Sequence, residues 1–309
     1  MRLYFAPLEG ITTYTYRNTH REIFGGPDRY FAPFITPSAN ERVSIKSLRD
    51  IVPEKNADTP LDVQVMSNTA SAFLNFEDKI RELGYTSVNL NFGCPSSTVV
   101  KKSRGAGILR DLALLDEFLS EVFAKTKLDI SVKTRTGFEN SLQFDHIMDI
   151  YNKYPITELI IHPRCREEYY KGEPNREVFA NALSAAKMPI CYNGNVFSLE
   201  DYEKIVKQFP ETRSVMLGRG AIANPALMRE IKGGKLLMTS ELVKFTRVLI
   251  PRYLDLLGSE VYTLHKLKEI WLYMMWNFPD EKKLLKAVKK SNKLNDLVSV
   301  IECLPEIRR

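Results

Sequence analysis

The feature that most constrains the fold of this 309-residue chain is an alternation of short apolar runs with longer helical patterns, which fills its first three quarters. Each run is rich in β-branched and aromatic residues and ends in a Gly, Pro or Asn cluster, as β-strands do. Segment 111–125 is typical of the helical patterns, because its apolar residues recur at helical spacing. The eight expected strands are Leu3–Leu8, Arg29–Ile35, Leu61–Met66, Ser87–Phe92, Asp129–Thr134, Glu158–His162, Pro189–Asn193 and Ser214–Leu217.

Eight strand–helix units of even length predict one α/β architecture, the closed parallel (β/α)8 TIM barrel. The alternative is an open doubly wound sheet, which does not require eight units. After Ile231 the turn Lys232-Gly233-Gly234-Lys235 breaks the alternation, and no convincing strand follows. We therefore expect a catalytic barrel domain at 1–238 and a small C-terminal all-helical domain at 239–309.

The expected helical domain carries an apolar stripe and a lysine-rich helix. Leu264, Leu267, Trp271 and Met274 lie at helical spacing, and both Trp271 and Trp276 are expected to anchor packing. The lysines of the later helix are Lys282, Lys283, Lys286, Lys289, Lys290 and Lys293. Lysine-rich helices are usually solvated, so these patterns alone favour a plain helical bundle.

Charge and composition limit the class of protein. The net charge is +6, and from Glu241 onward 13 basic residues stand against 9 acidic ones, a balance that suits a polyanionic partner. No apolar stretch approaches the roughly 20 residues that span a bilayer, and the first residues lack a signal-peptide pattern. We expect a cytoplasmic protein with no membrane partner and no obligate protein partner. Four cysteines without paired spacing predict neither a disulfide framework nor a metal site.

The loops that follow the strands are where a barrel enzyme keeps its working groups, and phosphate commonly binds after strands seven and eight. Here Asn193-Gly194-Asn195 and Gly218-Arg219-Gly220 follow those two strands. Glycines let backbone amides approach a phosphate, and an arginine can grip two of its oxygens. Either cluster alone is explained by a turn that needs Gly and Asn, whereas the two clusters together favour a phosphate site.

Other candidate side chains lie at the ends of predicted strands three, five and six. Lys133 places a cation at the barrel mouth, where it would serve as a Schiff-base nucleophile or stabilise the N1 and O2 edge of a reduced flavin. A snorkelling surface lysine is the alternative. His162 and Arg164 stand together at the same rim. Gln64 has both a donor and an acceptor for the edge of a heterocycle, or caps a loop.

The strongest local signal is the run after strand four, Asn91-Phe92-Gly93-Cys94-Pro95, with Gly105-Ala106-Gly107 beyond it. Cys94 lies between Gly and Pro on a loop at the catalytic face. A role in core packing is a poor explanation for a cysteine at that position. Cys165, Cys191 and Cys303 are instead expected to be inert core fillers.

These residues resemble the tRNA-dihydrouridine synthase family over essentially the whole chain. The resemblance is carried by Ala6-Pro7-Leu8-Glu9-Gly10-Ile11-Thr12 with Arg17, by the Asn91 to Gly105 signature and by the segment His265 to Tyr273, which is similar to the family's RNA-recognition helices. It implies Cys94 as the catalytic acid. The residues it implies for FMN are Pro7, Leu8, Glu9, Gln64, Asn91, Lys133, His162, Asn193, Gly194, Asn195, Gly218 and Arg219.

The resemblance also implies the reaction and the partner. The C5–C6 double bond of specific tRNA uridines would be reduced to 5,6-dihydrouridine, with NADPH as reductant of FMN. The base would be extruded from the tRNA to reach the barrel mouth. The residues expected to contact substrate or RNA are Arg164, Arg135, Lys101, Lys266, Lys268 and Lys286.

Three other functions are compatible with parts of the sequence. One is an FMN barrel that acts on a free pyrimidine or on dihydroorotate, which would not need the basic tail. A second is a Schiff-base aldolase built around Lys133. The third is a tRNA-binding protein without catalytic activity.

Overall fold

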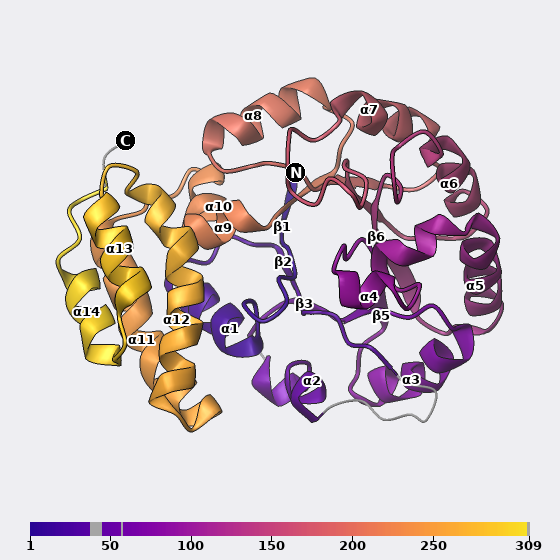
Figure 1. Ribbon diagram of the computed structural model, residues 1–309. Coiled ribbons are helices and arrows are strands. Elements are labelled where there is room, and N and C mark those ends of the chain that lie inside the picture. The colour runs from indigo at the N-terminus through magenta and orange to yellow at the C-terminus, as the bar shows by residue number, and fades with distance from the viewer. Residues whose placement is uncertain (38–44, 57, 308–309) are drawn as a thin grey trace.

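The computed structural model describes residues 1–37, 45–56 and 58–307, and these residues form a parallel barrel surrounded by helices (Figure 1). The strands are β1 Arg2–Phe5, β2 Arg29–Phe31, β3 Leu61–Asp62, β4 Gln64–Val65, β5 Ser87–Phe92, β6 Asp129–Arg135, β7 Leu159–His162, β8 Ile190–Tyr192 and β9 Ser214–Leu217. The helices of the barrel are α1 Tyr14–Ile23, α2 Ile45–Arg49, α3 Ala70–Glu82, α4 Ser97–Val100, α5 Leu112–Lys125, α6 Phe144–Tyr151, α7 Arg176–Ala185, α8 Leu199–Gln208, α9 Arg219–Ala223 and α10 Leu227–Ile231, with 3-10 turns at Pro53–Lys55 and Gly105–Arg110.

The barrel is closed through a strand that is interrupted at one residue. The hydrogen-bonded order is β3-β2-β1-β9-β8-β7-β6-β5-β4, and only Val63 separates the two end strands of that order. Val63 still accepts a hydrogen bond from the Asn89 amide at 2.9 Å, and Ile35 pairs with Val65 in parallel. The nine strands are therefore the eight predicted ones with the third broken, and the TIM-barrel prediction is confirmed.

The predicted strand boundaries agree with the structure for some strands and not for others. β5 and β9 have the predicted bounds, whereas β1 and β2 end three and four residues early, at Phe5 and Phe31. β1 ends there because the chain after it turns back on itself, with the Ile11 and Thr12 amides both donating to the Leu8 carbonyl. This turn places residues 7–9 at the barrel mouth instead of in the ladder.

A helical segment at 239–307 packs against one side of the barrel, beside α1 and α9 (Figure 1). It consists of α11 Thr239–Leu257, α12 Glu260–Met274, a 3-10 turn at Met275–Asn277, α13 Lys282–Lys290 and α14 Leu294–Glu302. The two parts share one apolar core, in which Phe245 of α11 meets the rings of Tyr16 and Phe24 at 5.4 and 5.2 Å. The division into domains 1–238 and 239–309 stays a prediction.

The predicted apolar stripe of α12 is buried throughout, and the Trp271 indole also donates to Thr246 Oγ1 at 3.0 Å. The expectation that Trp276 anchors packing is wrong, because 49% of this residue is exposed. Cys165 and Cys191 are buried as expected, but Cys303 is exposed. Of the helices that the structure describes, none has the length and apolar character of a membrane span.

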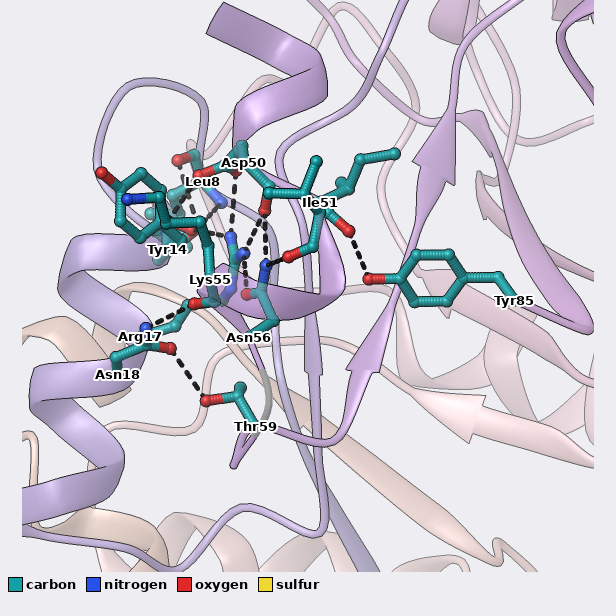
Figure 2. A network of polar contacts seen from close by, with 12 residues as sticks. Leu8, Tyr14, Arg17, Asn18, Asp50, Ile51, Lys55, Asn56, Thr59 and Tyr85 are labelled. Carbon is teal, nitrogen blue, oxygen red and sulfur yellow. Dashed lines mark hydrogen bonds and ion pairs between the residues drawn. The ribbon is translucent and has the colours of Figure 1, made fainter. Parts of the chain in front are cut away.

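A buried arginine fixes the turn after β1 to the segment before β3 (Figure 2). Arg17, on α1, is fully buried and donates to the Thr12 carbonyl at 2.7 Å, to Asp50 Oδ2 at 3.0 Å and to Asn56 Oδ1 at 2.8 Å. The other oxygen of Asp50 accepts from the Tyr14 amide at the start of α1. This network holds the loop that carries residues 7–9, although Arg17 itself does not line the barrel mouth.

We predict that Asp50→Ala lowers the free energy of unfolding by about 3 to 5 kcal/mol, because it leaves the buried Arg17 cation without its counter-charge. Urea denaturation followed by circular dichroism measures this. The matched control is Asp78→Ala, which removes the exposed partner of Arg81 and should cost at most about 1 kcal/mol. Equal effects of the two substitutions would contradict the structural role given to Arg17.

Candidate active site

A cavity of about 300 Å³ opens at the carboxyl ends of the barrel strands. It is lined by residues that come from loops far apart in the sequence, among them Leu8, Gln64, Cys94, Lys133 and His162. A smaller cavity of about 60 Å³ adjoins it, because Pro7, Leu8, Lys133, His162 and Tyr170 line both. The barrel therefore brings the predicted candidates to one continuous hollow.

The Cys94 loop is held by hydrogen bonds to its backbone on both sides of the thiol. Asn91 Oδ1 accepts from the Gly93 amide at 3.0 Å and from the Cys94 amide at 2.9 Å. Arg135 Nε donates to the Gly93 carbonyl at 2.9 Å, and Arg166 Nε donates to the Pro95 carbonyl at 3.1 Å. These contacts leave the half-buried Cys94 side chain at the cavity wall.

Gly105, the last residue of the signature, is required for a steric reason. Gly105 adopts φ +54°, and a Cβ there would lie 2.8 Å from the Cys94 carbonyl oxygen. The same carbonyl accepts a hydrogen bond from the Ala106 amide at 3.0 Å. The spacing between Cys94 and Gly105 therefore closes a loop that only glycine allows at this point.

A chain of buried amides connects three strands to the Cys94 loop. Asn89 Nδ2 donates to Ser131 Oγ at 2.9 Å, Gln64 Nε2 to Asn89 Oδ1 at 2.7 Å, and Asn91 Nδ2 to Gln64 Oε1 at 2.8 Å. Each carboxamide thus has a fixed orientation, since a flipped one would place two donors face to face. Within the described part of the chain, Gln64 has one N–H and one lone pair without a partner, and its side chain lines the cavity.

The electrostatics of the cavity favour a neutral thiol, a neutral imidazole and a free cation. Burial raises the pKa of the Cys94 thiol, so the thiol stays protonated near neutral pH. Burial, aided by Arg135, lowers the pKa of His162 well below its usual range. Burial also lowers the pKa of Lys133 to about 8. Among the described residues no acceptor lies within hydrogen-bond distance of Lys133 Nζ, although the side chain lines both cavities.

The smaller cavity is the predicted phosphate end. Asn193, Gly194, Gly218 and Arg219 line it. Asn195 stands behind them, and its Oδ1 accepts from Arg219 Nη2 at 3.1 Å. This contact orients the guanidinium, which also lies 4.4 Å from the centroid of the Tyr170 ring. The arrangement has one directed cation and two glycines, which suits a bound phosphate.

Several residues predicted to contact RNA are used within the protein. All three donor nitrogens of the buried Arg135 bond to backbone carbonyls, those of Gly93, Cys165 and Tyr169. Arg164 is fully buried as well and donates to the Lys171 and Gly172 carbonyls. We infer that both arginines act on the substrate site by positioning loops, and their contact with substrate stays a prediction.

The predicted lysines lie in two kinds of environment. Lys266 bonds to the Gly10 carbonyl at 2.7 Å and Lys268 to the Ser291 carbonyl at 2.8 Å, so both help to fix α12. Lys101, at the end of α4, and Lys286, on α13, are exposed. Glu9 is exposed at the edge of the larger cavity.

Four further residues line the larger cavity and were missed from the sequence: Phe34, Tyr170, Glu269 and Tyr273. Phe34 lies inside the second predicted strand, which the structure ends at Phe31, so its place at the mouth was hidden by that prediction. Tyr170 lies in the loop after His162, so its position after a strand was available as a signal. Glu269 and Tyr273 come from α12, and no pattern in the sequence shows that this helix borders the barrel mouth.

A parallel barrel with a cavity at its carboxyl face, lined by a lysine, a cysteine and a histidine, is the arrangement of a TIM-barrel enzyme. The dihydrouridine synthase (Dus) family model matches residues 4–305, and the chain belongs to this family. Within the described ranges, His, Cys, Asp and Glu side chains form no group that could hold a metal ion.

Similar proteins span most of the chain. A tRNA-dihydrouridine synthase B of Pseudomonas aeruginosa is 28% identical over 231 residues, which cover 74% of this chain and 68% of the relative. A tRNA-dihydrouridine(16) synthase of Neisseria meningitidis serogroup B is 29% identical over 287 residues, covering 89% and 85%. The solved structure of morphinone reductase has the same fold, with a TM-score of 0.52, 11% identity and coverage of 76% of this chain and 86% of that chain.

We predict that the Cys94 thiol reacts with iodoacetamide at a higher pH than an ordinary thiol does, because its raised pKa delays formation of the reactive thiolate. Mass spectrometry of the alkylated peptide across pH 7 to 10 measures the midpoint. Free N-acetylcysteine in the same buffers is the control. A midpoint for Cys94 below that of the free thiol would show an activated nucleophile in place of an acid.

Proposed function

We propose that this protein is a tRNA-dihydrouridine synthase that reduces the C5–C6 bond of uridine in tRNA, with bound FMN and with NADPH as reductant. The observation that carries the proposal is that Lys133, a cation with no hydrogen-bond partner among the described residues, and Cys94, a protonated thiol, line one cavity. Family membership supports the same reaction.

The residues of the hollow fit FMN. Lys133 would face the N1 and O2 edge of the ring, where a cation stabilises the reduced form. Gln64 and the neutral His162 would supply hydrogen bonds to polar atoms at the ring edge, and Pro7 and Leu8 would pack against the ring. Asn193, Gly194, Gly218 and Arg219 would hold the phosphate. When bound, FMN supplies the hydride that adds to C6 of the base.

Cys94 supplies the other hydrogen. Hydride addition at C6 leaves an enolate that is conjugated to the C4 carbonyl, and C5 then needs a proton. The thiol donates this proton and recovers it from solvent, so one uridine, one NADPH and one proton give one dihydrouridine and one NADP⁺. The Cys94 amide donates to Asn91 and Arg135 donates to the Gly93 carbonyl, and these two hydrogen bonds would fix the direction from which the thiol approaches C5.

The tRNA would be bound by the basic side chains around the mouth. Lys286 lies on α13 with four other lysines, and Lys101 follows the catalytic loop. Phosphate contacts of this kind give affinity without sequence preference, while the extruded base is read in the cavity. Lys266 and Lys268 would contribute by holding α12 in place as well as by their charge.

We predict that Cys94→Ala leaves FMN content and NADPH-dependent flavin reduction unchanged but lowers the rate of dihydrouridine formation by about 10² to 10⁴, the usual contribution of a positioned acid. Stopped-flow absorbance measures the first reaction and nucleoside mass spectrometry the second. The control is Cys303→Ala, which changes an exposed thiol. Full activity of Cys94→Ala on tRNA would refute the role of the thiol.

The Schiff-base aldolase is the alternative that Lys133 still supports, because a pKa of about 8 also suits an amine nucleophile. Borohydride reduction in the presence of a carbonyl substrate would attach that substrate to Lys133 only if the protein were an aldolase. A yellow preparation that shows no such adduct would exclude the aldolase.

We predict that tRNA affinity falls steeply with added salt and that Lys286→Ala lowers the slope of log K against log [salt] by about 1. Filter binding at several salt concentrations measures the slope. The control is Lys79→Ala on α3, which lies across the barrel from the helical segment and removes the same charge (Figure 1). Identical slopes for the two variants would place the RNA elsewhere.

A further inference from the structure

Three aromatic side chains form a cluster where the helical segment meets the barrel. Trp276, in the 3-10 turn after α12, lies 5.7 Å from the ring centroid of Phe197, in the loop after β8, and 5.4 Å from that of Tyr273, at the end of α12. The interplanar angles are 62° and 57°, so neither neighbour stacks flat on the indole. We call these three residues the aromatic platform.

The platform is exposed to an extent that packing does not explain. Trp276 keeps 49% of its surface exposed, while the other tryptophan, Trp271, keeps 1%. A single exposed apolar residue is ordinary, but a cluster of aromatic rings at the edge of a cavity is typical of a binding surface. The two neighbours contact the indole at an angle, and about half of the residue is left to solvent.

The platform is continuous with the catalytic cavity. Tyr273 lines the cavity that also contains Cys94 and Lys133. Phe197 lies 5.4 Å from the guanidinium of Arg219, which lines the smaller cavity. Trp276 thus contacts one residue that lines the larger cavity, Tyr273, and one that contacts Arg219 of the smaller cavity, Phe197.

The position of Phe197 in the platform is fixed by close backbone packing. A Cβ on Gly220, in α9, would lie 2.0 Å from the Val196 carbonyl oxygen, so α9 and the loop after β8 touch directly. On the other side, Asn277 Nδ2 donates to the Ala223 carbonyl at the end of α9. The turn that carries Trp276 is thus attached to the same short helix, and the platform needs no rearrangement before it binds.

We propose that the platform stacks the nucleotide that adjoins the target uridine in the RNA. This inference rests on the proposed function. Extruding one base from a stack removes a stacking partner from its neighbour, and an aromatic side chain replaces that partner whatever the base is. The platform would thereby hold the strand open beside the cavity and raise the affinity for RNA without reading its sequence.

The test compares Trp276→Ala, Trp276→Phe and the matched control Tyr262→Ala in the FMN-loaded protein. Tyr262 is 64% exposed at the far end of α12, about 16 Å from Tyr273 at a rise of 1.5 Å per residue. FMN content and thermal melting establish that each variant is folded. The readouts are the dissociation constant for an unmodified tRNA transcript, kcat/KM for that transcript, and the rate of flavin reduction by NADPH.

We expect Trp276→Ala to weaken tRNA binding and to lower kcat/KM by about tenfold, which corresponds to about 1.4 kcal/mol at 25 °C. Trp276→Phe should stay within about threefold of wild type, Tyr262→Ala should be unchanged, and flavin reduction by NADPH should be equal in all variants. Unchanged tRNA binding by Trp276→Ala would overturn the inference. Slower flavin reduction with unchanged tRNA binding would overturn it too, because the platform would then bind the nicotinamide nucleotide.

Repeating the binding measurement in the Cys94→Ala background separates this inference from the proposed function. The loss of RNA affinity on Trp276→Ala needs no chemical step, so it should persist in that background. Wild-type protein that binds tRNA through Trp276 but forms no dihydrouridine would refute the proposed reaction and support the platform.

Discussion

The site depends on one carboxamide, that of Asn91. Its oxygen accepts the amides of Gly93 and Cys94, and its nitrogen donates to Gln64, which is itself fixed by Asn89 and the strand beyond. A thiol on an unrestrained loop would sample many directions, whereas positioned acid catalysis needs one. The hydrogen-bond chain transfers the rigidity of the barrel strands to the sulfur atom and keeps the buried amides paired.

The helical segment contributes residues to the cavity as well as to the outer surface of the protein. Lys266 of α12 bonds to the Gly10 carbonyl in the turn after β1, and Glu269 and Tyr273 line the cavity. The RNA recognition proposed for this segment and the chemistry proposed for the barrel would therefore be linked through α12. A substitution that shifts this helix is expected to affect both the binding of the RNA and the shape of the mouth.

The sequence predicted the architecture well because strand–helix alternation is a local signal that the barrel preserves. It also predicted many of the strand-end residues that line the mouth, since the ends of parallel strands share one face. It could not predict that Arg135 donates to backbone carbonyls, that Arg164 bonds to two carbonyls and to the side chains of His162 and Asn195, or that Trp276 is exposed while Trp271 is buried. Those outcomes depend on contacts between residues distant in the sequence, which spacing does not encode.

The central claim is that the thiol of Cys94 protonates C5 while the flavin delivers hydride to C6 from within the barrel. Turnover of an unmodified tRNA transcript in D₂O, with unlabelled NADPH and a short reaction time, tests it most directly, by mass spectrometry and NMR of the product nucleoside. Because C5 takes an exchangeable proton, the account predicts one solvent deuterium at C5 of the product, whereas label at C6 depends only on exchange of the flavin N–H with solvent. A product without solvent deuterium at C5 would contradict it.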